Sequence, residues 1–230
     1  MSRRTALVTG GNRGIGLETA RQLARAGFQV FLSARDGAAA AATAAGLAAT
    51  GLPVHPLALD VSREGAVQAC AAQLSAQGVQ VDVLINNAGI FPEGDALDAA
   101  AHRFVEAIEV NALGPLWCAR AWLPGMLARG HGRIVNLSSG YGCFSAGLGG
   151  PAAYSIAKAA LNAVTLKLAQ LARGDVKINA VDPGWVRTRM GGPGAPRPVE
   201  DAAADVVWAA MLPADGPNGV LLRQRRIVDW

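Results

Sequence analysis

Short apolar segments alternate with longer helical patterns along the 230-residue chain, and this alternation restricts its fold more than any other feature. The near-continuous apolar segment VDVLIN (81–86) is typical of a strand that is covered on both faces. Strands separated by helices predict βαβ units and a parallel sheet. The predicted strands are 5–9, 29–34, 53–60, 81–89, 132–139, 176–184 and 219–222, and the predicted helices are 16–27, 36–50, 63–77, one or two within 99–129, 152–173 and 199–211.

No linker or internal repeat divides the chain. We therefore predict a single α/β domain over residues 1–230, doubly wound, with a mostly parallel central sheet and helices on both faces. Aromatic residues make up only 5% of the chain, so Ala, Val and Leu must build its core. Ligands of such sheets bind at the carboxyl ends of the strands, so functional motifs are expected directly after strands.

A glycine-rich loop, TGGNRGIG (9–16), joins the first predicted strand to the first helix. Gly10, Gly14 and Gly16 leave room for a tight turn and for the backbone to approach a pyrophosphate. The free N–H groups at the start of the following helix would then face the anion. The position between a strand and a helix favours a dinucleotide site, and an ordinary glycine-rich turn is the alternative.

The second predicted strand ends at SARD (33–36), which bears on the choice between NAD(H) and NADP(H). In NAD-binding sheets a carboxylate about 20 residues past the loop binds the ribose hydroxyls. Here Arg35 follows Gly16 by 19 residues, and a guanidinium can pair with a 2′-phosphate instead. Arg13 could add a second positive charge. We predict NADP(H) as the preferred cofactor, although Asp36 follows directly and Arg35 could be only a solvated strand end.

The charge balance indicates neither a nucleic-acid-binding nor a membrane protein. The net charge is +4, the sequence pI is about 9.3, and the basic residues are spread along the chain. Only RQRR (223–226) is clustered, and we interpret it as a solvated terminal segment. Nucleic-acid binding would require a basic stripe with stacking aromatic residues, which the sequence lacks. No apolar segment approaches the roughly 20 residues of a membrane span.

The three cysteines do not form a metal-ligand or disulfide pattern. Cys70, Cys118 and Cys143 are widely separated, and none belongs to a CxxC pair. Cys70 and Cys118 lie in helical patterns and are predicted in the core. No metal is expected, and reduced thiols without a signal peptide predict a cytoplasmic protein.

Seven motifs in order resemble the classical short-chain dehydrogenase/reductase family. They are TGGNRGIG (9–16), LDVS (59–62), NNAG (86–89), VNALGP (110–115), NLSSG (136–140), YSIAK (154–158) and INAVDPGWVRT (178–188). The resemblance covers nearly the whole chain and implies one Rossmann-type domain. The ending GVLLRQRRIVDW (219–230) resembles the carbonyl-reductase-like branch, which favours NADPH.

The resemblance also implies roles for individual residues. Ser139, Tyr154, Lys158 and Asn111 would form the catalytic group, with Asn111 supporting the lysine through a water and Ser138 as the alternative serine. Asp60 and Val61 would flank the adenine. The residues implied in cofactor binding are Gly10, Asn12, Arg13, Gly14, Ile15, Gly16, Arg35, Asp60, Val61, Asn87, Ala88, Gly89, Val110, Tyr154, Lys158, Pro183, Gly184, Val186 and Thr188.

The chain departs from the family pattern in two places that border the expected substrate pocket. Ser139 and Tyr154 are 15 residues apart, slightly more than is usual in the family. The chain is also short after Thr188, where residues 185–198 are rich in Gly and Pro and are predicted to form a substrate-side loop. Tyr141, Phe144 and Trp185 would shape the substrate pocket, and anchoring of these loops is the alternative role for them.

Tyr154 and Lys158 lie four residues apart in an alanine-rich helical pattern, so they share one face of the helix. A free tyrosine has a pKa near 10, which is high for an acid–base group at neutral pH. The lysine ammonium would stabilise the phenolate, and Ser139 would hold the substrate oxygen near the phenol.

Two functions are open at this point. The first is an NADPH-dependent oxidoreductase that reduces a ketone or aldehyde to an alcohol, reversibly, with Tyr154 as proton donor. The alternative is a non-catalytic protein that senses NADP(H) or binds a partner on the same fold. Such proteins often lose the tyrosine or the lysine, and this chain keeps both. The family is often dimeric or tetrameric through the helices predicted at 99–129 and 152–173, so a homodimer or homotetramer is a further expectation.

Overall fold

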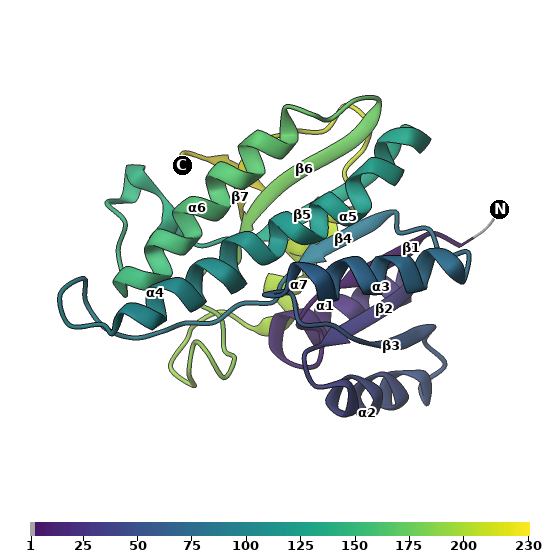
Figure 1. The fold of residues 1–230 in the computed structure, drawn as a ribbon, viewed down its shortest axis with the longest axis horizontal. Coiled ribbons are helices and arrows are strands. Elements are labelled where there is room, and N and C mark those ends of the chain that lie inside the picture. The colour runs from purple at the N-terminus through teal and green to yellow at the C-terminus, as the bar shows by residue number, and fades with distance from the viewer. Residues whose placement is uncertain (1–2) are drawn as a thin grey trace.

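The computed structural model describes residues 3–230, which contain one eight-stranded sheet (Figure 1). The strand order is β3-β2-β1-β4-β5-β6-β7-β8, and only β8 is antiparallel to its neighbour. The predicted mostly parallel sheet is confirmed. The strands are β1 (Thr5–Val8), β2 (Gln29–Ala34), β3 (Val54–Ala58), β4 (Val83–Asn86), β5 (His131–Leu137), β6 (Asp175–Asp182), β7 (Leu221–Arg223) and β8 (Arg226–Val228).

Helices cover both faces of the sheet, because successive side chains of each buried strand point to opposite faces. Ala6 and Val8 pack in one core cluster with α1, α2 and α7, whereas Leu7 packs in the other with α3, α5 and α6. The predicted doubly wound arrangement is therefore confirmed (Figure 1). The helices are α1 (Gly14–Arg25), α2 (Gly37–Ala48), α3 (Glu64–Ala76), α4 (Ala101–Ile108), α5 (Gly114–Arg129), α6 (Ala152–Ala169) and α7 (Val199–Ala210).

The strand order reverses between β1 and β4. The chain runs outward from β1 to β3 at one edge and then returns to pair β4 with β1. The loops that follow β1 and β4 therefore leave the sheet side by side in opposite directions. This is the place where doubly wound sheets form a ligand crevice.

The predicted helical region 99–129 consists of two α-helices with a π turn between them. The π turn spans Glu109–Leu113 and joins α4 to α5 without a break. Asn111 lies in this turn and is fully buried. Single π turns within helices occur frequently at functional sites, because they re-aim one side chain.

The C-terminal region differs from the prediction. Residues 219–222 were expected as the last strand and 223–226 as a solvated segment, but β7 and β8 form a hairpin whose turn is built from that segment. Gln224 and Arg225 take left-handed backbone conformations, with φ of 48° and 63°. Ion pairs from Arg223 to Asp182 and from Arg225 to Asp205 hold the hairpin. Residues 223–226 are exposed, as predicted, but the hairpin and its ion pairs were missed because both carboxylates are distant in the chain.

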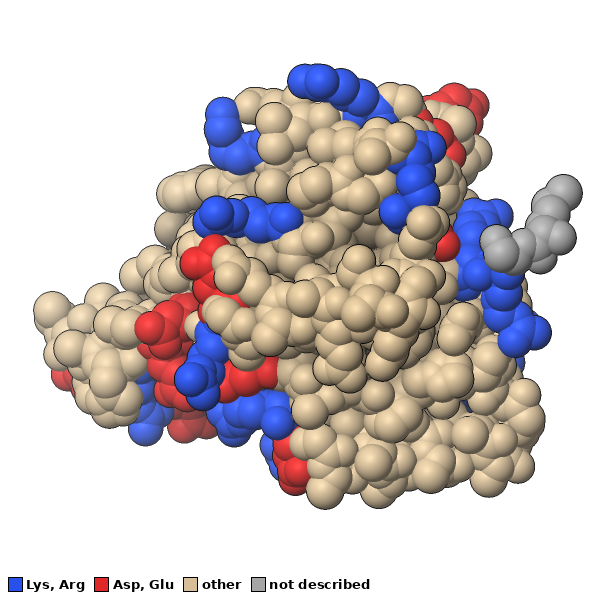
Figure 2. Space-filling view, turned by 45° about the vertical axis from the view of Figure 1, so that its right-hand side comes forward, with Lys and Arg blue, Asp and Glu red and all other residues tan. Residues whose placement is uncertain are grey.

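The surface and core agree with the distribution of residue types. Cys70, Cys118 and Cys143 are free and buried, as predicted for the first two. Figure 2 shows Lys and Arg in separate groups on one face, with wide uncharged areas between them. Among residues 3–230, no helix is long and apolar enough to cross a membrane. In the same range, His, Cys, Asp and Glu side chains do not gather in threes as a metal site would require.

Candidate active site

The glycine loop is fixed by the segment that follows β4. The Asn87 side-chain amide donates to the carbonyl oxygens of Thr9 and Gly10, at 2.8 and 2.9 Å. The Thr9 hydroxyl in turn accepts from the backbone N–H groups of Asn87 and Ala88, at 3.0 and 3.1 Å. The structure thus brings together two predicted cofactor segments, the glycine loop and the NNAG motif. The side chain of Asn87 stabilises the conformation of the loop.

Glycine is required at two loop positions by the close approach of these segments. Gly10 has a φ of 61°, and a Cβ atom there would lie 2.8 Å from the Cα atom of Ala88. A Cβ atom on Gly16 would collide with the Asn87 amide and lie 2.6 Å from the Gly10 carbonyl oxygen. The loop therefore stays close to the backbone of its neighbour and leads directly into α1.

Replacing Gly16 with alanine is expected to lower the free energy of unfolding by about 1–3 kcal/mol, the usual effect of overpacking a tight site. Thermal or urea unfolding measures the change. Gly46→Ala in α2 is the matched control, because nothing lies within 4 Å of its Cβ position. The control should be neutral or gain up to about 1 kcal/mol, since glycine destabilises a helix interior. Equal unfolding curves for the two variants would contradict the steric argument.

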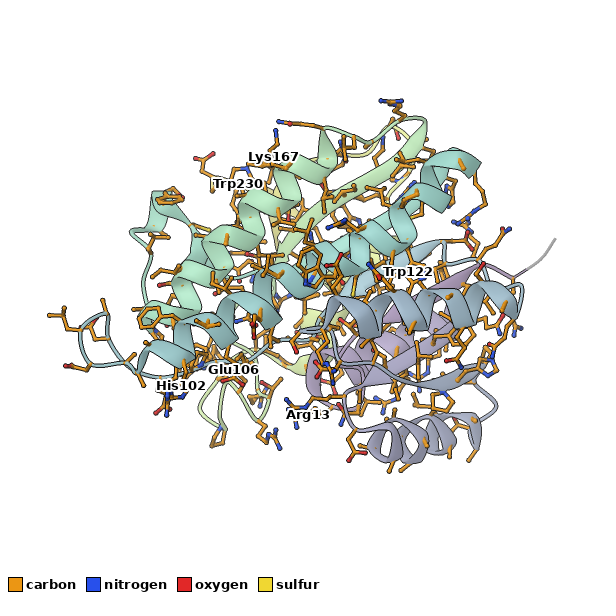
Figure 3. The ribbon with its side chains drawn as sticks, in the orientation of Figure 1. Arg13, His102, Glu106, Trp122, Lys167 and Trp230 are labelled. Carbon is orange, nitrogen blue, oxygen red and sulfur yellow. The ribbon has the colours of Figure 1, made fainter. Side chains whose placement is uncertain are left out.

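Three arginines gather near the start of α1. The pKa of Arg13 is lowered by burial and then by the nearby positive charges of Arg189 and Arg35. Figure 3 shows Arg13 at the opposite side of the molecule from Trp230.

Asp36, the residue that complicated the cofactor prediction, caps α2 by accepting from the N–H groups of Ala38 and Ala39 at 2.9 and 3.3 Å. Sequence reasoning missed Arg189, although it directly follows the family motif that ends at Thr188.

The other predicted cofactor residues line the same edge of the sheet. The Thr188 side chain approaches Gly14, where a Cβ atom would lie 3.4 Å from the threonine methyl group. Asp60 is engaged in its own turn, because its carboxylate accepts from the hydroxyl and the N–H of Ser62 at 2.7 and 3.1 Å. Val61 is buried against Gly114 at the start of α5. Partly buried positions are taken by Asn12, Ile15, Ala88, Gly89, Val110 and Pro183, whereas Val186 is buried and Gly184 exposed.

Tyr154 and Lys158 lie on the buried face of α6, with 8% and 5% of their surface exposed. Ala153 and Ala157, which directly precede Tyr154 and Lys158, pack against α4 and bring the helix close to its neighbour. The Lys158 ammonium donates to the carbonyl oxygen of Leu137 at 2.6 Å and lies 5.5 Å from the centre of the Tyr154 ring. The predicted i, i+4 pair is therefore positioned at the carboxyl end of β5.

Burial dominates the protonation of this pair. It raises the pKa of Tyr154 to about 12, an effect that interaction with the Ser139 side chain partly opposes and the negative charge of Asp182 increases. Burial lowers the pKa of Lys158 to about 8, and Asp182 opposes that change. At neutral pH the phenol is thus protonated and the amine is still largely charged.

The two serines after β5 have different surroundings. The Ser138 hydroxyl is buried and donates to the Asn162 side chain at 2.5 Å. Ser139 is only partly buried, and it is the serine whose side chain interacts with Tyr154. Its oxygen also accepts from the N–H of Tyr141 at 3.2 Å. Of the two hydroxyls, that of Ser139 interacts with the phenol of Tyr154, and its contact with a substrate stays a prediction.

Asn111 lies beside the lysine through the π turn. Its amide donates to the carbonyl oxygen of Ile90 and accepts from the Ile90 N–H, both at 2.9 Å. A Cβ atom on Gly89 would lie 3.0 Å from the Asn111 amide oxygen and 3.9 Å from the Lys158 nitrogen. The structure therefore gathers Asn111, Gly89 and Lys158 at one point.

Phe91, a residue that sequence reasoning missed, packs against the predicted proton donor. Its ring centre lies 4.6 Å from that of Tyr154, at an interplanar angle of 59°. The available signal was an aromatic residue two positions after the NNAG motif. Phe91 shields one face of the Tyr154 ring and contributes to the burial that raises its pKa.

The predicted substrate residues are exposed and lie on the loops beside this group. Tyr141, Phe144 and Trp185 expose 46%, 72% and 61% of their surface. The Trp185 indole donates to the Gly191 carbonyl oxygen at 2.7 Å, and the Tyr141 ring packs on Gly150, so both also anchor loops. A cavity of about 590 Å³ is lined by Gly184, Trp185, Arg197, Arg223 and Arg225 among others. Trp185 thus lines a cavity, whereas contact of the three aromatic residues with a substrate stays a prediction.

The family profile described as short chain dehydrogenase matches residues 4–196. Carbonyl reductase (NADPH) 1 of Bos taurus is 32% identical over 273 aligned positions, which cover 98% of this chain and 98% of that relative. The fold, the motifs and these similarities agree, and the chain belongs to the short-chain dehydrogenase/reductase family of oxidoreductases. The resemblance predicted from the sequence is confirmed.

Relatives with different named substrates are about equally similar. A galactitol 2-dehydrogenase of Rhizobium johnstonii is 35% identical over 187 residues, covering 80% of this chain and 71% of that protein. The NADPH-bound carbonyl reductase from chicken fatty liver superimposes with a TM-score of 0.86 at 26% identity, covering 100% of both chains. Family membership therefore establishes that the protein is an oxidoreductase, but it does not identify the substrate.

The chain is shorter than the bovine relative it matches end to end. Their alignment has 273 positions against 230 residues here, so at least 43 positions have no residue in this chain. In the structure, residues 185–198 lead directly into α7 at Val199. Residues 185–198 are thus a short connection between β6 and α7.

Proposed function

We propose that this protein reduces a ketone or aldehyde to an alcohol with NADPH, and catalyses the reverse reaction when NADP⁺ is in excess. The observation that carries the proposal is the position of Tyr154, beside Ser139 and one helical turn from the Lys158 ammonium. The cofactor named for the bovine and chicken carbonyl reductases supports the choice of NADPH.

The residues around the glycine loop fit a phosphorylated dinucleotide. The loop carries no side chain at Gly10 or Gly16 that would keep a pyrophosphate away from the backbone, and it ends at the N-terminus of α1. Burial lowers the pKa of Arg13, and the positive charges of Arg189 and Arg35 lower it further. An anion with the charge of a 2′-phosphate would offset this repulsion.

When bound, the reduced nicotinamide supplies the hydride. The Ser139 hydroxyl donates a hydrogen bond to the substrate oxygen and keeps it near the phenol of Tyr154. Tyr154 gives its proton to that oxygen as negative charge develops there. The Lys158 ammonium stabilises the phenolate that remains, and Asn111 holds the lysine side of the site through its pairing with Ile90.

Arg35→Asp is expected to weaken NADPH binding about 10- to 100-fold, because a charge-assisted hydrogen bond contributes roughly 1.5–3 kcal/mol. NADH binding should be unchanged or stronger. Quenching of tryptophan fluorescence by each cofactor measures both affinities. Arg25→Asp at the far end of α1 is the control, since it changes the net charge equally. If the ratio of the two affinities stays that of the wild type, Arg35 does not recognise the 2′-phosphate.

The proposed activity is tested by NADPH oxidation at 340 nm against a panel of aldehydes, apolar ketones and keto-sugars. Turnover of at least one carbonyl class is expected, with the matching alcohol and NADP⁺ giving the reverse reaction. Tight NADPH binding without turnover of any class would instead favour the NADP(H)-sensing protein.

We infer self-association from the family resemblance as a separate proposal. Val105 on α4 and Ile156 on α6 expose 58% and 46% of their surface. Both belong to the helices that the resemblance implicates in dimers or tetramers. Sedimentation of the purified protein measures the state directly.

A further inference from the structure

A buried carboxylate at the end of β6 is paired with the C-terminal hairpin. Asp182 is only 3% exposed and lies directly opposite Arg223 in the β6–β7 register. Its Oδ2 atom accepts from the Arg223 guanidinium at 2.6 Å, and its Oδ1 atom accepts from the Gly184 N–H at 2.9 Å. Both carboxylate oxygens are therefore engaged, one by a cation from a distant part of the chain.

This ion pair touches both loops that flank the proposed acid–base group. Asp182 holds the turn at Gly184, where the family motif places the nicotinamide. On the other side, a Cβ atom on Gly140 would collide with the Arg223 guanidinium and lie 3.2 Å from Asp182 Oδ2. Gly140 directly follows Ser139. Arg223 therefore packs against the residue next to the serine that is proposed to bind the substrate oxygen.

Asp182 also lies near the titrating groups of α6. In the β5–β6 register Leu137 lies opposite Val181, and the Leu137 carbonyl oxygen is the atom that accepts from Lys158. The next residue along β6 is Asp182. Its charge acts on Lys158 and Tyr154 from α6 and on Cys143 from the loop after β5. Tyr141 is the remaining titratable group that acts on Tyr154.

We propose that Arg223 is a positioning residue for the proposed acid–base pair: it holds Asp182 in place beside Lys158 and Tyr154 and offsets its negative charge. The mechanism assigned to the pair rests on the proposed function, whereas the electrostatic coupling does not. The hairpin that carries Arg223 is thereby a functional part of the site.

Loss of the Arg223 charge should change the pKa of Lys158 most directly. An uncompensated carboxylate nearby favours the ammonium form of lysine and disfavours the phenolate form of tyrosine. With an effective dielectric constant of about 20, a unit charge about 10 Å away shifts a pKa by roughly one unit. Both groups should therefore titrate at higher pH when Arg223 is replaced and Asp182 is kept.

The lysines of this chain make a direct measurement practical. The chain has three lysines, Lys158, Lys167 and Lys177, and the last two can be changed to arginine. Carbon-13 NMR of lysine labelled at Cε then follows Lys158 alone, starting from its pKa of about 8. This readout requires no substrate, cofactor or turnover.

In this background Arg223→Met is expected to raise the pKa of Lys158 by about one unit. Arg223→Lys should keep most of the wild-type value, because it restores a cation. The double variant Arg223→Met with Asp182→Asn should return the pKa to the wild-type value or below it. A pKa that moves equally in the single and double variants would overturn the proposal, because the carboxylate would then not carry the effect.

Arg225→Met is the matched control. Arg225 lies in the same hairpin, its side chain is 49% exposed against 46% for Arg223, and it also pairs with a buried carboxylate, Asp205. It should destabilise the hairpin to a similar degree and leave the Lys158 titration in place. An equal shift in this variant would show that general loosening of the hairpin, and not the charge at Asp182, moves the pKa.

Turnover separates this proposal from the proposed function. If wild-type protein reduces a carbonyl, the alkaline limb of the pH–rate profile for reduction should move up by about the same one unit in Arg223→Met. If no carbonyl is turned over while the Lys158 titration shifts as expected, the coupling stands and the proposed function fails. If turnover is normal and the titration does not shift, the role of Arg223 fails alone.

Discussion

Replacing Tyr154 with phenylalanine is expected to lower kcat for carbonyl reduction by about 100- to 10,000-fold, the usual contribution of a positioned proton donor. The variant removes one oxygen atom and keeps the ring that packs against Phe91. The glycine loop and the arginine cluster are untouched, so NADPH affinity should fall by at most about tenfold, the effect of one lost hydrogen bond. Steady-state rates and fluorescence titration measure the two quantities.

The form of the activity loss distinguishes the role of Tyr154 from a packing effect. An interaction made only in the transition state lowers kcat and kcat/KM equally. A variant that retains wild-type turnover would rule out Tyr154 as the proton donor.

Replacing Lys158 with methionine is expected to stabilise the folded protein at pH 7 while it abolishes most of the activity. Folding lowers the pKa of this amine from 10.5 to about 8. Between these two pH values the amine is therefore protonated more often in the unfolded chain than in the folded protein. The resulting penalty is fully present below pH 8 and disappears as the pH rises towards 10.5. The expected gain at pH 7 is on the order of 2 kcal/mol, reduced by the lost hydrogen bond to Leu137.

Urea unfolding of wild type and Lys158→Met at several pH values measures this effect. The difference in unfolding free energy should be largest at neutral pH and become small near pH 10.5. Lys167→Met is the control, since Lys167 is an exposed residue near the other end of α6. A Lys158→Met variant that is less stable than wild type at pH 7 would mean that the hydrogen bond to Leu137 outweighs burial of the charge.

The sequence was sufficient to predict the sheet and to name the candidate site residues that the structure brings together, because their signals are local. The segment VLIN forms β4 as its apolar run predicted, and TGGNRGIG follows β1 as its glycines predicted. The spacing of Tyr154 and Lys158 is a property of one helix, so it could be predicted without the fold. Ser139 was chosen over Ser138 on the family motif, and the different surroundings of the two hydroxyls agree with that choice.

The remainder depends on contacts between residues that are distant in the chain. Asp182 and Arg223 are 41 positions apart, and the local sequence pattern around each residue does not indicate that the other is its partner. β8 was missed because its run of three residues carries no strand signal beside the arginines. The π turn at Asn111 was missed because a helix with one extra residue has almost the same hydrophobic pattern as two joined helices.

The turn between β7 and β8 also limits how this chain can be engineered. Left-handed positions in a two-residue hairpin turn are usually given to Asn and Gly, which adopt them at low cost. Here Gln224 and Arg225 occupy them, and the arginine side chain reaches Asp205 at 3.1 Å. A stabilising consensus turn would relieve the backbone and at the same time remove that cation from Asp205. Substitutions that improve most hairpins are therefore poorly suited to this one. Its turn needs an arginine side chain long enough to contact Asp205, even though other residues would adopt the backbone conformation at lower cost.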